Sequence, residues 1–168
     1  MTQPTLALSL FFHLTATAFW IGGLLLTVFT VWPESRRALG EGSESMRLLM
    51  RLRQRMTPYF NLALAVLLVT GVFQMTADKY YDGLMQFDNE WSRVILLKHI
   101  ALLGMIVCGV LIQVGVAPAL ERLTLLDSKG KGDPAEYARL RRREVRLTWA
   151  SAALGVLILA FSAWAGTL

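Results

Sequence analysis

The hydrophobic residues of this chain fall into four long blocks that are separated by short polar stretches. The blocks cover residues 6–32, 59–77, 94–119 and 147–168, and charged residues are nearly absent within them. A helix needs about 20 mostly apolar residues to cross the hydrocarbon core of a membrane. Lipid also requires each spanning segment to satisfy its own backbone hydrogen bonds, which a helix does. The pattern therefore predicts an all-α integral membrane protein, a four-helix up-down-up-down bundle.

Proline, capping residues and polar turns predict where each helix begins and ends. We expect a single transmembrane domain over residues 1–168, with helices at about 5–32, 58–77, 90–126 and 134–167. Pro33 is expected to stop the first helix, because proline lacks an N–H and clashes with the preceding turn. Thr57-Pro58 is typical of a helix start, and Asp133–Glu136 has the arrangement of a capping box. Pro118 is expected to kink the third helix.

Basic residues are distributed unequally among the connections, and this predicts the orientation. Residues 33–57 carry six Arg against three acidic residues, and residues 121–146 carry eight Lys or Arg against five. Residues 78–93 carry two basic residues against four acidic ones. Lys and Arg accumulate on the cytoplasmic side of a membrane. We therefore expect both termini to be extracytoplasmic in a bacterial inner membrane, and the net charge of +5 indicates topology rather than a nucleic-acid partner.

The chain has two histidines, and both lie inside apolar blocks. A histidine in a membrane helix is unusual and commonly functional. His13 follows Thr5 by eight residues and His99 follows Trp91 by eight, so a rise of 1.5 Å per residue places both about 9–12 Å below the outer boundary. The first and third helices are diagonal in such a bundle, and bundle cores often hold cofactors. Our first interpretation is that the two imidazoles face each other and ligate the iron of a b-type haem.

Other residues of the first helix fit a haem site. Thr17 and Trp20 follow His13 at helical spacings of four and seven, so they share its face. Thr17 leaves room for a flat ring, and Trp20 would pack against the edge of that ring. Gly23 would let the macrocycle or a neighbouring backbone come close. We therefore expect these residues to contribute to cofactor binding.

Cations near the outer boundary are candidate partners for haem propionates. Arg93 lies about 9 Å above His99 along the helix. Lys98 is adjacent to His99 but points about 100° away around the helix axis. Either side chain would serve a propionate or would instead extend to the outer interface, as long basic side chains commonly do. Both alternatives stay open at this point.

Two other interpretations of the histidines were weighed. A membrane histidine is often a hydrogen-bonded contact between helices and nothing more. Copper is the competing metal, since Cu(I) favours sulfur ligands from Cys and Met. Cys108, Met105 and Met75 are available, but no Met-rich or His-rich cluster marks an outer opening. The single cysteine also excludes an internal disulfide.

Three motifs resemble those of the CopD-like membrane proteins, a family named for copper resistance. They are HLTATAFWIGG at residues 13–23, LLVTGVF at 67–73 and LLKHIALLGMIV at 96–107, and the resemblance covers nearly the whole chain. It implies copper uptake or tolerance. The chain is also similar to the HemJ-type protoporphyrinogen oxidases, whose helix-one histidine and helix-three lysine would match His13 and Lys98. The adjacent His99 departs from that pattern and would close the iron to substrate.

These observations lead to one main functional expectation and two alternatives. The main expectation is a haem b protein that transfers electrons and is not an enzyme, working as a subunit of a respiratory or photosynthetic complex. The alternatives are a CopD-like protein that binds or transports copper, and a HemJ-like porphyrinogen oxidase. The expected partners are the lipid bilayer and a membrane or extracytoplasmic redox protein. Homo-oligomerisation is left open.

Overall fold

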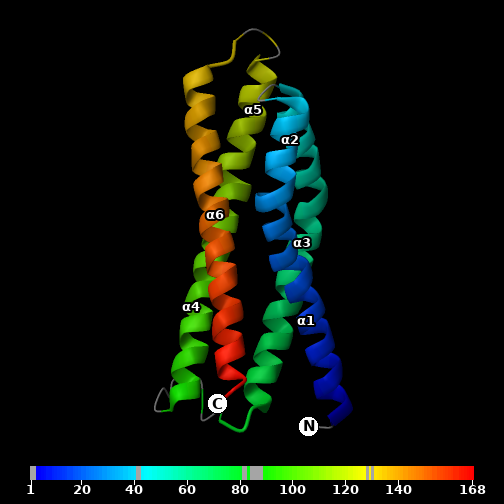
Figure 1. Cartoon of the computed structure of the whole chain (residues 1–168), viewed down its shortest axis with the longest axis vertical. Helices are drawn as coiled ribbons and strands as arrows, with labels where there is room; N and C mark the ends of the chain where they lie inside the picture. The colour runs from blue at the N-terminus through cyan, green and yellow to red at the C-terminus, as the bar shows by residue number, and fades with distance from the viewer. Residues whose placement is uncertain (1–2, 41–42, 81–82, 84–88, 128, 130) are drawn as a thin grey trace.

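A computed structural model describes residues 3–40, 43–80, 83, 89–127, 129 and 131–168. All the secondary structure in these residues is helical, and four helical rods are long and apolar enough to span a membrane, as predicted. Figure 1 shows the rods running side by side. In chain order their elements are α1 (Gln3–Leu26), the π-helix η1 (Thr27–Val31), α2 (Trp32–Leu39), α3 (Ser43–Ala77), α4 (Glu90–Val110), the π-helix η2 (Leu111–Val116), α5 (Ala117–Asp127) and α6 (Pro134–Ala165).

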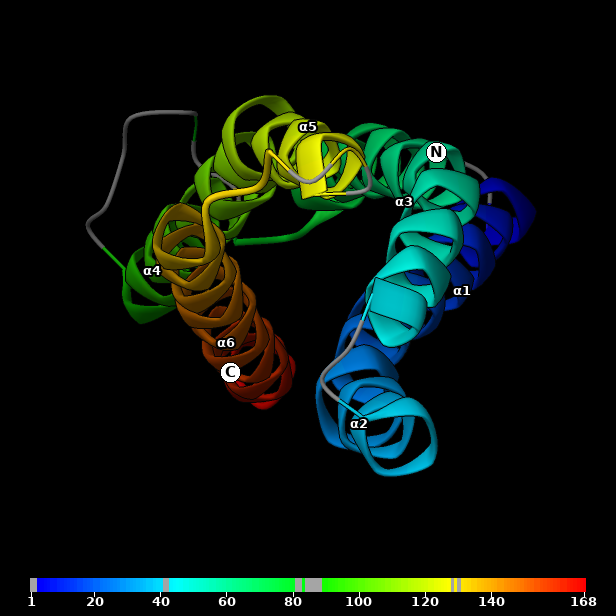
Figure 2. The ribbon, with the colours of Figure 1, turned by 90° about the horizontal axis from the view of Figure 1, so that it is seen from above.

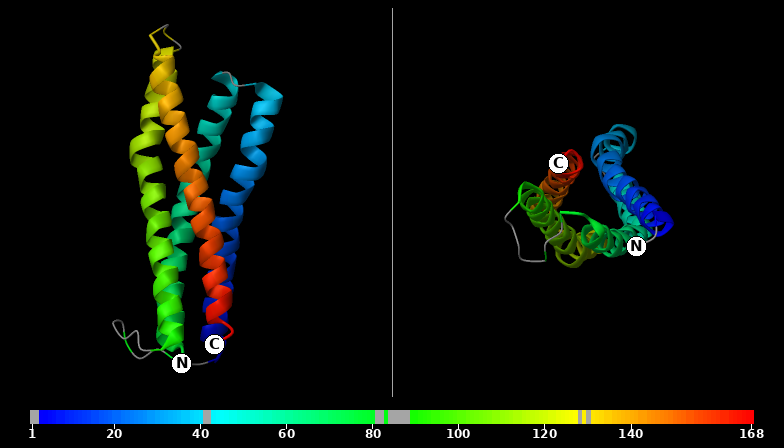
Figure 3. Two further views of the ribbon diagram at one scale, coloured as in Figure 1. Left: turned by 60° about the vertical axis from the view of Figure 1, so that its left-hand side comes forward. Right: turned by 90° about the horizontal axis from the view of Figure 1, so that it is seen from below.

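The rods form two antiparallel hairpins. In the first hairpin α1 packs along α3, and in the second α4 packs along α6. The two hairpins meet through α1 and α6 and through α3 and α5, and Figures 2 and 3 show them as two separate pairs when the bundle is viewed along its axis. Both chain termini lie at one end, called here the terminal end, while α2 and α5 lie at the other, called the loop end.

The outer surface of the bundle is apolar along the middle of the rods. Val69 is 71% exposed, Val114 is 75% exposed, and Leu62 is 63% exposed. A protein surrounded by water rarely presents so large an apolar surface. Surrounded by lipid, the same side chains cost nothing to expose. The surface therefore agrees with the membrane bundle that the sequence predicts.

Pro33 does not end the first rod, so that expectation was wrong. The rod continues through α2 to Leu39, with Pro33 in the first turn of α2. The reason lies in the preceding π-helix, where the N–H of Trp32 bonds to the carbonyl of Thr27 five residues earlier. This wider turn loosens the backbone just where the proline ring would clash with a regular helix.

The third rod repeats this arrangement at Pro118. The N–H of Ala117 bonds to the carbonyl of Ile112, again five residues earlier. η2 ends at Val116, immediately before Ala117-Pro118. A π-helix is a recognised cause of helix bending. The irregularity expected at Pro118 is therefore present, and it takes the form of a π-helix.

Thr57-Pro58 does not begin the second membrane helix, which corrects another expectation. Helix α3 runs without interruption from Ser43, and Pro58 lies inside it. The hydroxyl of Thr57 donates to the carbonyl of Arg53 at 2.9 Å instead of capping a helix start. In the first turns of α3, Met46 is buried against Val116 and Leu120.

Side chains cap two of the helices, and the cap at Asp133 confirms a prediction. The side chain of Asn89 accepts a hydrogen bond from the N–H of Ser92 at 2.7 Å and caps α4. The carboxylate of Asp133 accepts from the N–H groups of Ala135 and Glu136 and caps α6. Each bond satisfies backbone donors that a helix start leaves without partners.

Candidate functional site

A cavity of about 470 Å³ lies between the two hairpins in the half of the bundle nearer the terminal end. Helices α1, α3, α4 and α6 all contribute to its wall. Its volume lies within the range that small-molecule sites occupy. Five of the residues singled out from the sequence line it together: His13, Thr17, Trp20, Lys98 and His99.

His13 is held in one orientation by α3. Its Nδ1 atom lies 2.8 Å from Oγ1 of Thr70. The Thr70 hydroxyl donates its own proton to the carbonyl of Val66 at 2.6 Å, so its oxygen is left to accept a proton from His13. The ring of His13 also lies against Gly71, where an added Cβ would come within 3.4 Å of Cε1. His13 therefore carries its proton on Nδ1, which leaves the lone pair of Nε2 open.

His99 reaches the same state by a different contact. Its Nδ1 atom lies 2.7 Å from the carbonyl oxygen of Ile95, one turn earlier in α4. A carbonyl can only accept, so this nitrogen must carry the proton. The ring is more exposed than that of His13, and it lines the same cavity. In the neutral form of each ring, Nε2 is therefore the nitrogen without a proton, the arrangement in which histidine binds metals.

Two methionines add sulfur to the donors around the cavity. Met75 of α3 and Met105 of α4 both line it. Met105 is buried, and a Cβ added at Gly155 would lie 3.6 Å from its sulfur. The sequence alone gave Met75 and Met105 little weight, because they are far apart along the chain and fall in no cluster. Cys108, by contrast, is absent from the cavity wall.

Lys98 places a positive charge in this largely apolar wall. It lies within electrostatic reach of His13, and among the described residues it forms no ion pair. Asp78 lines the same cavity, with its carboxylate accepting from the N–H of Tyr80 at 3.0 Å. The wall therefore combines imidazole and thioether donors with one ammonium group and one carboxylate.

Two predicted site residues lie outside the cavity wall. Gly23 faces α3, where an added Cβ would come within 2.8 Å of the Phe60 ring, so this glycine permits close packing of α1 on α3. Arg93 is exposed near the start of α4 and is not part of the wall. Their expected roles in cofactor binding therefore stay predictions.

Carboxylate-rich metal sites are absent from the described part of the chain. No group of three or more His, Cys, Asp and Glu side chains there is placed to hold a metal ion. A metal in the cavity would rely on the two imidazoles and the two thioethers. Such ligands suit a soft ion, whereas Mg²⁺ and Ca²⁺ require several oxygen ligands.

Comparison with known proteins agrees with the resemblance seen in the motifs. A family model described as CopD, Copper resistance protein D, matches residues 47–165. No curated protein and no solved structure matches the chain. The family match covers most of the chain, including α3, α4 and α6, which supply His99, Lys98, Met75 and Met105. The chain belongs to the CopD family of copper resistance membrane proteins.

Proposed function

We propose that this protein binds copper(I) in the cavity between its two hairpins. The observation that carries the proposal is the set of donors around one cavity: His13, His99, Met75 and Met105. Imidazole and thioether are ligands that suit copper, and thioethers favour its reduced form. Membership of a family named for copper resistance supports the same conclusion. Copper would be the cargo of the protein and not a resident cofactor.

The hydrogen bonds of the two histidines support this proposal. Each Nδ1–H is already used, by Thr70 for His13 and by a backbone carbonyl for His99. Bonds of this kind fix the orientation of a metal-binding imidazole and raise its basicity. Neither ring would need a large rearrangement to present Nε2 to an ion in the cavity.

The proposed orientation places the cavity in the outer half of the membrane. The excess of Lys and Arg in residues 33–57 and 121–146 supports a cytoplasmic loop end in a bacterial inner membrane. Both termini and the cavity then lie toward the extracytoplasmic side. Copper would reach the histidines from that side of the membrane.

A b-type haem bound by His13 and His99 is the second candidate. The size of the cavity favours it, since about 470 Å³ exceeds what one ion needs. The Lys98 ammonium also suits a propionate better than it suits a cation. The family match gives this candidate no support, so electron transfer and haem binding rank below copper. Porphyrinogen oxidation stays a prediction that no observation here favours.

Titration of the purified protein with copper(I) tests the proposal. The protein is reduced, kept anaerobic in detergent, and titrated against a chromogenic copper(I) chelator. We expect one tightly held ion per chain and a loss of affinity of at least about tenfold in both His13→Ala and His99→Ala. Cys108→Ala is the matched control and should bind as the parent does. A strong Soret band in the isolated protein, with no copper(I) binding, would replace the copper proposal by the haem candidate.

A further inference from the structure

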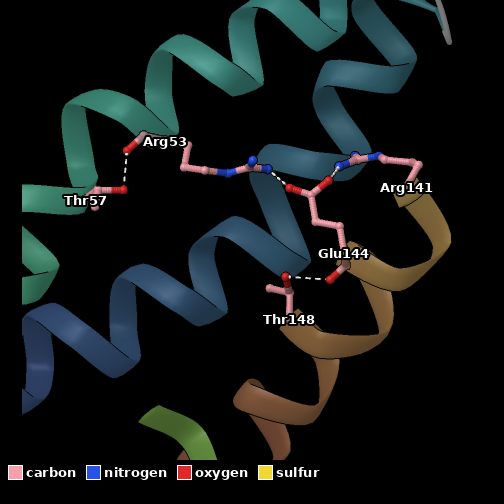
Figure 4. Close-up of polar contacts among 5 residues, drawn as sticks. All are labelled: Arg53, Thr57, Arg141, Glu144 and Thr148. Atoms are coloured by element: carbon pink, nitrogen blue, oxygen red, sulfur yellow. Dashed lines mark hydrogen bonds and ion pairs between the residues drawn. The ribbon is translucent and has the colours of Figure 1, made fainter. Parts of the chain in front are cut away.

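A buried carboxylate joins the two hairpins at the loop end. Glu144 of α6 is 1% exposed and forms ion pairs with Arg53 of α3 and with Arg141 one turn earlier in α6. Figure 4 shows its two oxygens facing the two guanidinium groups from opposite sides. This cluster could not be predicted from the sequence, because all three residues lie in segments where basic and acidic residues are expected to face water.

Apolar packing beside this cluster closes the loop end. Val116 and Leu120 are completely buried, and Met46 of α3 packs on them. Arg141 also lies over the Trp32 ring, with its guanidinium carbon 5.0 Å from the ring centre, so the cluster reaches the first rod as well. All four rods are therefore tied together at the end opposite the cavity.

The charges of Arg53, Glu144 and Arg141 are not needed to hold the two hairpins together. Taking a carboxylate and two guanidinium groups out of water is costly, and an apolar set of similar volume commonly holds an interface equally well. A buried ion pair suits a contact that must also separate, because water rehydrates each charge once the contact opens.

Two π-helices lie between the cavity and this junction. η1 and η2 each begin 12 to 14 residues beyond the histidine of the same rod, so they occur at similar depth in the first and third rods. Such segments interrupt the regular hydrogen-bond ladder and permit local bending. The first and third rods can therefore bend at η1 and η2. A bend there would move the loop end relative to the cavity.

We infer that Arg53, Glu144 and Arg141 form a gate that closes the cytoplasmic end of a transport path beginning in the cavity. Opening separates Arg53 from Glu144, and bending at η1 and η2 moves the hairpins apart at the loop end. The inference rests on the proposed function only for the identity of the cargo. The opening itself is a property of the chain and can be measured without copper.

Cysteine labelling tests the gate directly. In a Cys108→Ala background, Leu120→Cys reports access to the closed junction, and Leu48→Cys on the exposed side of α3 reports general reactivity. Inside-out vesicles are treated with a membrane-impermeant maleimide. We expect slow labelling at position 120 in the parent and labelling at least about tenfold faster with Glu144→Gln, while position 48 reacts equally in both. Equal labelling at position 120 in a folded Glu144→Gln variant overturns the inference.

A second variant decides the matter if Glu144→Gln fails to fold. The triple substitution Arg53→Met, Arg141→Met and Glu144→Met replaces the whole buried cluster by apolar side chains, a change that buried ionic clusters often tolerate. We expect a stable protein whose position 120 is labelled more slowly than in the parent, because no charge then favours hydration of the junction. Labelling as fast as in the parent, or faster, overturns the inference. Absence of copper(I) binding in the parent protein, with the expected labelling, would reject the proposed cargo and leave the gate standing.

Discussion

Nδ1 of His13 lies 2.8 Å from Oγ1 of Thr70, and this contact joins α1 to α3 across 57 residues of sequence. Thr70 is the acceptor in it, because its own proton goes to the carbonyl of Val66. The contact therefore decides which nitrogen of His13 faces the cavity. Thr70 would influence a bound ion by orienting His13, without contacting the ion itself.

Thr70→Val should weaken copper(I) binding by about tenfold while leaving the bundle intact. Valine keeps the shape of threonine but cannot accept the Nδ1 proton, so His13 would no longer be held in one tautomer. Chelator competition measures the affinity. Thr76→Val, on the same helix, is the control, because the Thr76 hydroxyl bonds only to the carbonyl of Phe73. Equal affinity in the Thr70 and Thr76 variants would show that the hydrogen bond does not position His13.

The architecture and the shared location of the histidines could be predicted from the sequence for simple reasons. Membrane thickness fixes the length of an apolar span, so four blocks of sufficient length indicate four helices. The rise per residue then fixes depth, which placed His13 and His99 at one level. These arguments need only the position of a residue along its own helix. The structure brings five of the seven proposed binding residues to the wall of one cavity, and their role in binding stays a prediction.

Contacts between helices could not be predicted in this way. Whether Gly23 faces a cofactor or a neighbouring ring depends on the rotation of α1 against α3, and the structure places the Phe60 ring there. Glu144 lies in a strongly basic segment, and nothing local to it indicates burial. Pro33 was misjudged because a π-helix before it loosens the backbone where the ring would clash, and Pro58 was misjudged because α3 continues through it.

Gly23→Ala should lower the free energy of unfolding by about 1–3 kcal/mol, because the new methyl group would overlap the Phe60 ring. That ring also packs against Phe19, with centroids 5.6 Å apart, and this limits how far it can move away. Thermal unfolding in detergent measures the change. Gly22→Ala is the matched control, since an added Cβ there meets nothing within 4 Å.

The rescue variant identifies the cause of the Gly23 effect. Phe60→Leu shortens the opposing side chain, so it should recover much of the stability lost in Gly23→Ala. A Gly23→Ala protein that is as stable as Gly22→Ala would exclude the packing role. A stable Gly23→Ala protein with weakened ligand binding would instead support the role in cofactor binding that the sequence suggested.

Lys98→Leu should strengthen copper(I) binding by about fivefold to tenfold. The ammonium of Lys98 repels a cation in the same cavity, and repulsion between like charges is strong where water is scarce. Leucine removes the charge, stays apolar and adds no metal ligand. Lys79→Leu changes the net charge of the protein equally at a residue outside the cavity wall, so it should leave the affinity unchanged. Weaker binding in Lys98→Leu would mean that Lys98 holds an anionic group, as a haem propionate requires.

Replacing both cavity methionines separates copper from haem most sharply. Met75→Leu with Met105→Leu keeps the apolar volume of the wall, and such exchanges cost little stability. The change removes both thioethers that a copper(I) ion would share with the imidazoles, so affinity should fall at least about tenfold. Met46→Leu, in the apolar layer at the loop end, is the control for a general effect of losing methionine. A haem bound only through His13 and His99 would be retained in the double variant, with its visible spectrum unchanged. If only the Met75/Met105 variant loses copper affinity, then the site contains sulfur ligands. Sulfur ligands belong to the copper proposal and not to a haem held by two histidines.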